Sequence, residues 1–234
     1  MQAMKKTILL GATGLVGQQL LQLLLSSDHY DKVTVFSRKP LEAHPKLQQI
    51  ICSDLSEMNQ NAATFEGVED VFCCLGTTIR VAKTRERFRE VDYDYPLLAA
   101  QLAKAAGVKR YLLVSAMGAN TNSNIFYSQV KGEIETAIQM LQLPSVCIFR
   151  PSLLLGNRTE FRFGERLSIL LSRPLEFIWR GKLLKYKPIH ASDVAMAMSR
   201  VAQMFLPGTH IFENDQLHHL SHPVVNNKIG TTSR

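Results

Sequence analysis

The chain has 234 residues, of which 46% are hydrophobic, and a formal net charge of +7. This length allows one substantial hydrophobic core and is short for two independent catalytic domains. The N-terminal segment lacks the long apolar run of a signal peptide, and no stretch approaches the roughly 20 apolar residues of a membrane span, so we expect a soluble, cytoplasmic protein without a membrane partner.

Four cysteines each fall inside a run that we predict to be a buried strand, namely Cys52, Cys73, Cys74 and Cys147. No pair of them has zinc-ligand spacing with histidines nearby. The neighbours Cys73 and Cys74 should point to opposite faces of their strand. We therefore expect free, reduced thiols and no metal site.

The N-terminal part of the chain predicts a strand, a glycine turn and a helix. Thr7–Leu10 is a short apolar run, Gly11–Gly17 is rich in glycine, and leucines then recur at helical spacing. β-branched and apolar runs predict three further strands, at Lys32–Ser37, Leu47–Ser53 and Val68–Leu75.

Helical periodicity returns at Val91–Ala106 and stops at Gly107, and Pro96 should kink or delay this helix. The remaining predicted elements are a strand at Arg110–Ser115, a helix at Tyr127–Leu141, a strand at Ser145–Arg150, an amphipathic stretch at Phe163–Leu171, a helix at Asp193–Phe205 and a strand at Gly208–Glu213. Alternating strands and helices require a parallel sheet that is covered on both faces.

The predicted fold class is therefore α/β, a doubly wound parallel sheet (Rossmann fold) with a small C-terminal substrate-side region. We expect a single nucleotide-binding domain over residues 1–220, with substrate-side segments at about 152–190. The last stretch, residues 221–234, is polar and aperiodic and is predicted to be a flexible tail.

The glycine turn has the spacing of a dinucleotide-binding site in the required context, directly after a strand and at the start of a helix. Gly11 permits the tight turn, Gly14 lets the backbone approach a pyrophosphate, and Gly17 lets the helix pack closely on the strand. The alternative is a turn that binds nothing. The predicted cofactor contacts here are Gly11, Thr13, Gly14, Leu15, Val16 and Gly17.

The end of the second predicted strand bears on the choice between NAD and NADP. An acidic residue at this point bonds the ribose hydroxyls of NAD, whereas arginine accommodates the 2′-phosphate of NADP. The chain has Ser37, Arg38 and Lys39 here, and no carboxylate follows until Glu42. We therefore favour NADP over NAD, the alternative being that these cations are ordinary loop residues.

Asp54 and Leu55 follow the third predicted strand. In a dinucleotide site they would bond the adenine amine and pack against its ring. An aspartate at the start of a loop is also a common helix cap, so this interpretation stays open.

Further motifs complete an ordered set along the chain. Leu75-Gly76-Thr77 closes the fourth strand, Ser115 closes the fifth, and a YxxxK motif places Tyr127 before Lys131. With the glycine turn and Arg150-Pro151, this order resembles the short-chain dehydrogenases/reductases, and more narrowly their atypical branch of Tat-interactive and NmrA-like proteins. The resemblance covers about residues 5–213.

The resemblance implies a catalytic set of Ser115, Tyr127 and Lys131. In that family the tyrosine exchanges a proton with the substrate oxygen, the lysine stabilises the tyrosinate and contacts the nicotinamide ribose, and the serine polarises the substrate carbonyl. The four-residue spacing places Tyr127 and Lys131 on one helix face. The further cofactor contacts that it implies are Leu75, Gly76, Thr77, Lys131 and Pro151.

Two hypotheses of different class follow. The first is an NADP(H)-dependent oxidoreductase that acts on a carbonyl or a sugar-like alcohol. The second is a regulatory or redox-sensing protein that binds NADP(H) and acts through a protein partner. The intact catalytic set favours the oxidoreductase, whereas the short substrate region favours the NADP(H)-binding sensor.

Cations are concentrated in residues 156–187, a segment that contains eight Lys and Arg residues but only three Glu residues. Such a basic segment suits an anionic small-molecule substrate, although a solvated face is an equally good interpretation. Nucleic acid is an unlikely partner because no recognised binding motif accompanies the cations. The basic stretch Arg80–Glu90 fits a homodimer face or a substrate gate, but we favour a solvated face.

Overall fold

The computed structural model describes residues 4–156 and 181–222 of the chain. A seven-stranded sheet forms its centre, with every neighbouring pair of strands parallel. The strand order is β3-β2-β1-β4-β5-β6-β9. The strands are β1 (Lys5–Leu10), β2 (Tyr30–Ser37), β3 (Leu47–Ile51), β4 (Val68–Cys73), β5 (Arg110–Val114), β6 (Ser145–Arg150) and β9 (Gly208–Glu213).

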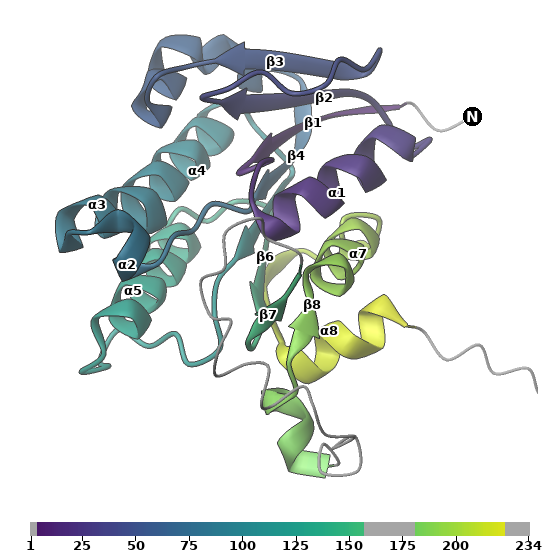
Figure 1. Ribbon diagram of the computed structural model, residues 1–234. Helices are drawn as coiled ribbons and strands as arrows, with labels where there is room; N and C mark the ends of the chain where they lie inside the picture. Colours follow the sequence, from purple (N-terminus) through teal and green to yellow (C-terminus); the bar gives the residue numbers. More distant parts are fainter. Residues whose placement is uncertain (1–3, 157–180, 223–234) are drawn as a thin grey trace, which may run out of the picture.

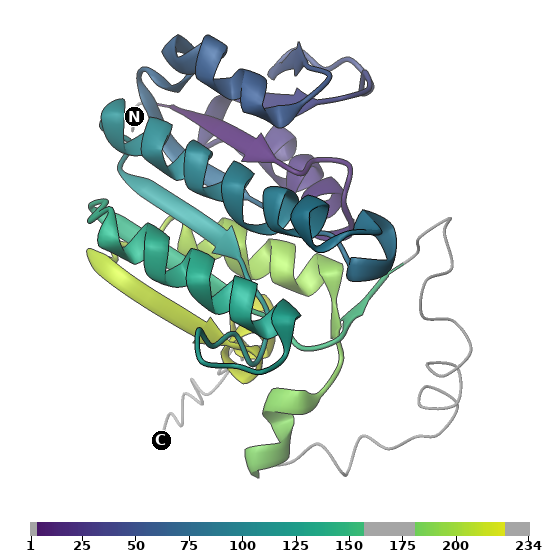
Figure 2. The ribbon, with the colours of Figure 1, turned by 90° about the vertical axis from the view of Figure 1, so that its left-hand side faces the viewer.

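Helices cover both faces of the sheet (Figure 1). On one face lie α1 (Leu15–Ser26), α7 (Ala191–Val201) and α8 (Asn214–Ser221). On the other lie η1 (Leu55–Phe65), α4 (Tyr95–Ala105) and α5 (Phe126–Met140), with α4 and α5 side by side in front of the strands in Figure 2. The predicted doubly wound parallel α/β fold is therefore confirmed.

Each face of the sheet has its own hydrophobic core. Alternate strand residues such as Leu9 and Phe72 pack under α1 and α7, whereas Ile8 and Val71 pack under α4 and α5. Parallel strands that are buried on both faces need near-continuous apolar runs. These runs are the reason that the strands could be predicted from the sequence. Cys73 and Cys74 illustrate the alternation, because Cys73 lies in the second core and Cys74 packs against the first.

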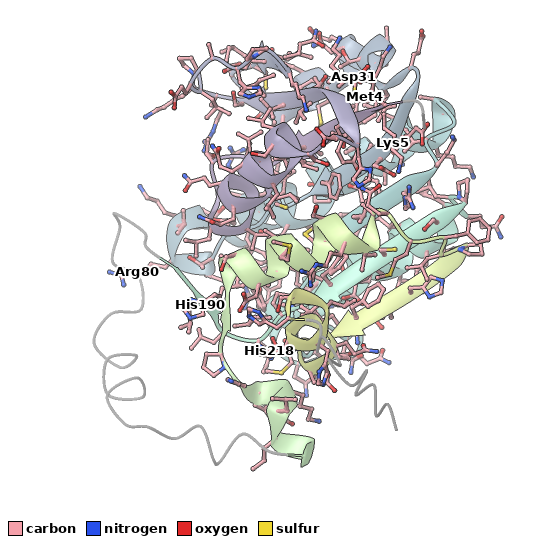
Figure 3. All side chains as sticks on the ribbon, turned by 90° about the vertical axis from the view of Figure 1, so that its right-hand side faces the viewer. Met4, Lys5, Asp31, Arg80, His190 and His218 are labelled. Atoms are coloured by element: carbon pink, nitrogen blue, oxygen red, sulfur yellow. The ribbon has the colours of Figure 1, made fainter. Side chains whose placement is uncertain are left out.

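The sheet order reverses between β1 and β4. The chain runs outward from β1 through β2 to β3 and then returns to β4 on the other side of β1. In open sheets of this kind, ligands bind beyond the carboxyl ends of the strands at this switch point. Figure 3 shows Arg80 and His190 on this carboxyl-terminal side of the molecule, with Lys5 at the opposite side.

The segment between β4 and α4 is helical in three short pieces, α2 (Ile79–Ala82), α3 (Arg85–Arg89) and the π-helical turn η2 (Glu90–Asp94). The sequence predicted one helix over 91–106 with a kink or delay at Pro96. Pro96 lies in the first turn of α4 but does not delay the helix, because the chain is already helical from Arg85 and enters α4 through the π turn η2. Gly107 has the positive φ of 71° expected just past a helix end.

In the C-terminal part of the chain, one predicted boundary is wrong. Ser221 was assigned to the tail but is the buried last residue of α8, so the tail begins later than expected. The amphipathic stretch 163–171 and residues 223–234 lie outside the described residues. At the edges of the substrate-side region, β7 (Leu154–Leu155) pairs with β8 (Ile189–His190), and η4 (Gly181–Tyr186) precedes β8.

Candidate cofactor and active site

The glycine turn between β1 and α1 is closed by its own backbone. Gly14 donates its amide to the Gly11 carbonyl at 2.9 Å, and Gly11 has a φ of +79°. A Cβ on Gly11 would lie 2.6 Å from the Cys74 carbonyl, and one on Gly17 would lie 2.0 Å from the Gly11 carbonyl. Gly11 and Gly17 are therefore required by the turn itself.

The outer side of the turn fits a dinucleotide phosphate. A Cβ on Gly14 would lie 3.3 Å from the Gly11 carbonyl oxygen and 3.9 Å from that of Cys74, a tight contact but not the collision found at Gly11 and Gly17. Gly14 is the N-cap of α1, and no side chain caps the helix or brings a negative charge to its first turn. The first amides of α1 and the positive end of its dipole are thus available to an anion.

The remaining predicted turn residues differ in exposure. Thr13 is exposed and accepts a hydrogen bond from Gln18 on its carbonyl, and Leu15 is half-buried. Val16 is buried in the core under α1, so only its backbone can face a ligand.

Beyond β2, the two predicted phosphate-binding cations are exposed. The Ser37 hydroxyl donates to the Lys39 carbonyl at 2.9 Å and so holds the turn that carries Arg38. Within the described ranges, neither Arg38 nor Lys39 forms an ion pair with a carboxylate. Both cations therefore remain available to an anionic ligand.

Asp54, predicted as an adenine contact, is a helix cap in the structure. Its side chain accepts from the Ser56 amide at 2.8 Å as the N-cap of η1, and it also accepts from the Tyr95 hydroxyl. These hydrogen bonds, with the charge of Arg87 nearby, lower the pKa of Asp54 to about 2. Leu55 packs at the edge of the second core, so the cap interpretation describes this position.

The loop after β4 carries three predicted contacts and one residue that the sequence reasoning missed. Leu75 is buried, Gly76 follows it, and the Thr77 amide donates to Asp92 Oδ2 at 2.8 Å. Asp92 comes from η2 and is only 1% exposed. Its partners, Thr77 and Lys131, lie far from it in the sequence, so no local motif indicated this residue.

Tyr127 and Lys131 lie on the first turns of α5, and the structure brings them to this loop. The Lys131 ammonium is 2.8 Å from Asp92 Oδ1, and both side chains are buried. Tyr127 is half-buried, and its ring packs against Phe88 with centroids 5.7 Å apart. Its hydroxyl makes no hydrogen bond to any other described residue.

Ser115 belongs to a separate group of polar side chains. Its buried hydroxyl donates to Glu135, one helical turn beyond Lys131 on α5. Arg150 donates to the same carboxylate, with Nε 3.0 Å from Oε1, and also pairs with Glu213 at 2.9 Å. These bonds raise the pKa of Arg150, mainly through the hydrogen bonds to Glu135. A serine that donates to Glu135 has no second proton for a substrate carbonyl.

The loops after β5 and β6 are joined directly. Pro151 is buried, and its carbonyl accepts from the Met117 amide at 2.9 Å. A Cβ on Gly132 of α5 would lie 2.3 Å from the Thr121 amide nitrogen, so the loop over this helix sits in contact with its backbone. Beside this contact lies an open polar cleft of about 290 Å³ between the loop, α5 and Arg150.

Comparison with known proteins agrees with this geometry. Residues 11–153 match the model of a family described as NAD(P)H-binding. The rat protein HTATIP2 is 40% identical over 168 residues, covering 70% of this chain and 69% of its own length. The mitochondrial protein FMP52 of Lodderomyces elongisporus is 35% identical over 211 residues, covering 86% of this chain and 88% of its own.

Solved structures share the fold at low sequence identity. WbmH of Bordetella bronchiseptica, solved with NAD⁺, superposes with a TM-score of 0.68 at 18% identity, covering 90% of this chain and 76% of its own. Uronate dehydrogenase of Agrobacterium tumefaciens gives a TM-score of 0.65 at 15% identity, covering 89% and 75%. These proteins thus share the fold of this chain.

The expected cytoplasmic location is wrong by the same comparison, because several fungal relatives are named mitochondrial proteins. Besides the one above, FMP52 of Candida albicans is 34% identical over 207 residues and covers 86% of this chain. Within the part of the chain that the structure describes, no helix is both long and apolar enough to cross a membrane.

Proposed function

The chain belongs to the NAD(P)H-binding family, in the atypical branch of the short-chain dehydrogenases/reductases, and from that premise we propose that it is an NADP(H)-dependent oxidoreductase acting on a carbonyl or a sugar-like alcohol. The observation that carries the proposal is the buried Lys131 ammonium at the turn after β4, with Tyr127 one helical turn before it. A charged lysine beside a tyrosine is an arrangement suited to proton exchange.

The residues that would hold the cofactor extend along the carboxyl edge of the sheet. The turn Gly11–Gly17 and the free amides of α1 suit the pyrophosphate, and Arg38 and Lys39 suit the 2′-phosphate. Leu75, Gly76, Thr77 and Pro151 follow the next strands of the same edge. When bound, NADPH supplies a hydride to the substrate, or NADP⁺ accepts one.

The chain itself supplies the proton. In reduction the Tyr127 hydroxyl donates a proton to the substrate oxygen, and the Lys131 ammonium stabilises the tyrosinate that remains. Contact with Phe88 holds the tyrosine ring in place. Ser115 polarises a carbonyl only when its hydroxyl turns away from Glu135 towards the substrate.

The test is Tyr127→Phe, which keeps the ring packing and removes the proton donor. We expect turnover to fall by roughly 10²- to 10⁴-fold, with NADPH affinity within about twofold of wild type. Turnover is measured from NADPH absorbance with aldehydes, ketones and sugar nucleotides, including carboxylated and phosphorylated substrates suited to the basic segment 156–187. Tyr93→Phe is the matched control and should keep wild-type turnover. Equal turnover of the Tyr127 variant would refute the proposed role.

A second candidate is an NADP(H)-binding sensor that acts through a protein partner. The observation that favours it is the engagement of Ser115 by Glu135, which leaves the Ser115 hydroxyl without a free proton to polarise a substrate carbonyl. This candidate predicts tight NADPH binding, no turnover with any substrate of the panel, and partner binding that survives Tyr127→Phe. Turnover with one substrate of the panel decides for the enzyme.

The preference for NADP is tested by titrating the protein with NADPH and with NADH. We expect Arg38→Glu to weaken NADPH binding far more than NADH binding, because only NADPH places a phosphate near this side chain. Glu42→Gln, a charge change nearby in the same loop, serves as the control. An equal loss for both cofactors would contradict a 2′-phosphate contact.

A further inference from the structure

The buried pair of Asp92 and Lys131 links two parts of the site that are far apart in sequence. Its nitrogen and oxygen are 2.8 Å apart, and the two side chains are 0% and 5% exposed. The second carboxylate oxygen of Asp92 accepts the Thr77 amide, also at 2.8 Å. One carboxylate thus fixes the ammonium of α5 against the loop after β4.

The local backbone explains how Asp92 reaches this position. It lies in the middle of η2, whose wide turn is closed by a hydrogen bond from the Tyr95 amide to the Glu90 carbonyl, five residues back. Pro96 has no amide to donate to the Asp92 carbonyl four residues before it, so an ordinary α-helix cannot run through this point. A π turn adds a residue to the helix and changes the direction of the side chains around it.

A glycine of the loop after β4 lies directly beside the buried pair. A Cβ on Gly76 would lie 3.5 Å from Asp92 Oδ1 and 3.7 Å from the Lys131 nitrogen, which are its nearest neighbours. The ion pair therefore lies directly beside the backbone of Gly76, a residue that the dinucleotide site is expected to use.

The buried Lys131 ammonium needs a negatively charged partner to stay protonated. Burial is the largest influence and lowers the pKa of Lys131, but the charge and hydrogen bond of Asp92, together with the nearby Tyr127 and Cys73, outweigh it, and the pKa is raised above its ordinary value. The other titratable groups that act on the ammonium are Tyr127 from its own helix and Cys73 from β4. An uncharged residue at position 92 would leave a buried ammonium without compensation.

We propose that Asp92 is a positioning residue of this site, which holds the Lys131 ammonium charged and directed towards the ribose side of a dinucleotide bound over Gly76. The proposal rests on the proposed function for the identity of the ligand. Asp92 acts through Lys131 and exchanges no proton with the substrate.

The test compares Asp92→Asn with Asp94→Asn, which removes an exposed carboxylate from the same π turn. NADPH affinity is measured by fluorescence between about pH 7.5 and pH 10, where the phosphate does not titrate. In Asp92→Asn the ammonium should lose its proton within this range, and affinity should then fall by up to about tenfold per pH unit. Wild type and the control should show flat profiles. A flat, wild-type profile in Asp92→Asn would overturn the proposal.

A second readout needs no cofactor. The ¹³Cε signal of Lys131, assigned by its absence in Lys131→Met, is followed against pH in free protein. It should stay constant to about pH 10 in wild type and titrate below that in Asp92→Asn. If wild type binds no NADPH, the proposed function fails, while this signal still decides whether Asp92 holds the ammonium.

If Asp92→Asn does not fold, Asp92→Glu serves as a second variant for testing the role of Asp92. The longer side chain retains the charge but displaces the ammonium, so we expect NADPH binding at least about fivefold weaker than wild type with a flat pH profile. Wild-type affinity in this variant would show that the position of the carboxylate is immaterial and would overturn the proposal.

Discussion

At the scale of single residues, the three glycines of the turn after β1 have different reasons to be glycine. Added Cβ atoms on Gly11 and Gly17 would collide with backbone carbonyls of the chain itself. Gly14 has an ordinary extended conformation, with φ −80° and ψ 170°, and an added Cβ would make a tight contact of 3.3 Å with the Gly11 carbonyl oxygen rather than a collision. The fold therefore requires Gly11 and Gly17, whereas Gly14 is the glycine that we propose to approach a ligand.

This difference predicts opposite phenotypes. Gly17→Ala should lower the free energy of unfolding by more than about 3 kcal/mol, because neither backbone can move away from the contact. Gly14→Ala should change stability by less than about 1 kcal/mol while weakening NADPH binding at least tenfold. Urea unfolding and fluorescence titration measure the two effects, with the exposed Gln19→Ala as control. Unchanged NADPH affinity in Gly14→Ala would remove Gly14 from the site.

Site residues could be predicted where local sequence determines their role. The glycine spacing and the YxxxK motif are short-range patterns, and the structure places Tyr127 and Lys131 on one helix as expected. Asp92 and Glu135 could not be found in this way. Each acquires its role from a partner far along the chain, and only the packed sheet brings these partners together.

At the scale of elements, most strands were predicted to within a few residues because they are short apolar or β-branched runs. The sequence interpretation missed η1 and α8. The mainly polar run of η1 begins with a capping box at Asp54 and Glu57. It is anchored by Met58 and Phe65 in the second core and by the hydrogen bond from the Tyr95 hydroxyl of α4 to Asp54. The helix η1 is therefore stabilised by tertiary contacts, which the periodicity of the sequence does not show.

The Asp54 cap predicts how stability depends on pH. Its pKa is about 2 when folded, below the unfolded value of about 3.9, so its contribution is complete above about pH 4 and is lost as the pH falls towards 2. Asp54→Asn should lower the urea midpoint at pH 7, and the difference from wild type should shrink below pH 4. Since Asp54 is 35% exposed, the effect will be modest.

Glu86→Gln provides the comparison for this experiment. It removes an exposed carboxylate from the first turn of α3, close to the same cluster. Its urea midpoint should differ little from wild type at any pH. If the Asp54 variant showed the same deficit at pH 2.5 as at pH 7, the cap would not depend on the ionised carboxylate.

At the scale of the whole molecule, separate polar clusters hold the two ends of the sheet. At the amino end, buried Asp70 accepts from Arg110 and from the Tyr30 hydroxyl, each at 2.7 Å. Lys5, labelled in Figure 3, is 3.8 Å from the same carboxylate. At the carboxyl end, Glu135 has a similar position between Ser115 and Arg150.

The two clusters should contribute independently to stability. Tyr30→Phe and Ser115→Ala each remove one hydroxyl from a buried carboxylate, at a cost of about 1.5–3 kcal/mol. Five residues of β5 separate the clusters by about 16 Å. The free energy of unfolding of the double variant, Tyr30→Phe with Ser115→Ala, should therefore fall by the sum of the two single effects within about 0.5 kcal/mol. Ser115→Ala combined with Arg150→Met, within one cluster, should deviate from additivity. Strong coupling in the first pair would contradict this division.

The adjacent thiols of Cys73 and Cys74 give this sheet a built-in pair of reporters. They belong to opposite layers, Cys73 buried and Cys74 half-buried, and burial raises the pKa of both, so each should react slowly with an alkylating reagent while its own layer stays closed. Labelling rates at the two neighbouring positions therefore time the opening of the α4–α5 layer and of the α1–α7 layer separately. Equal rates would mean that the two layers open as one cooperative unit, and unequal rates would identify the layer that opens first.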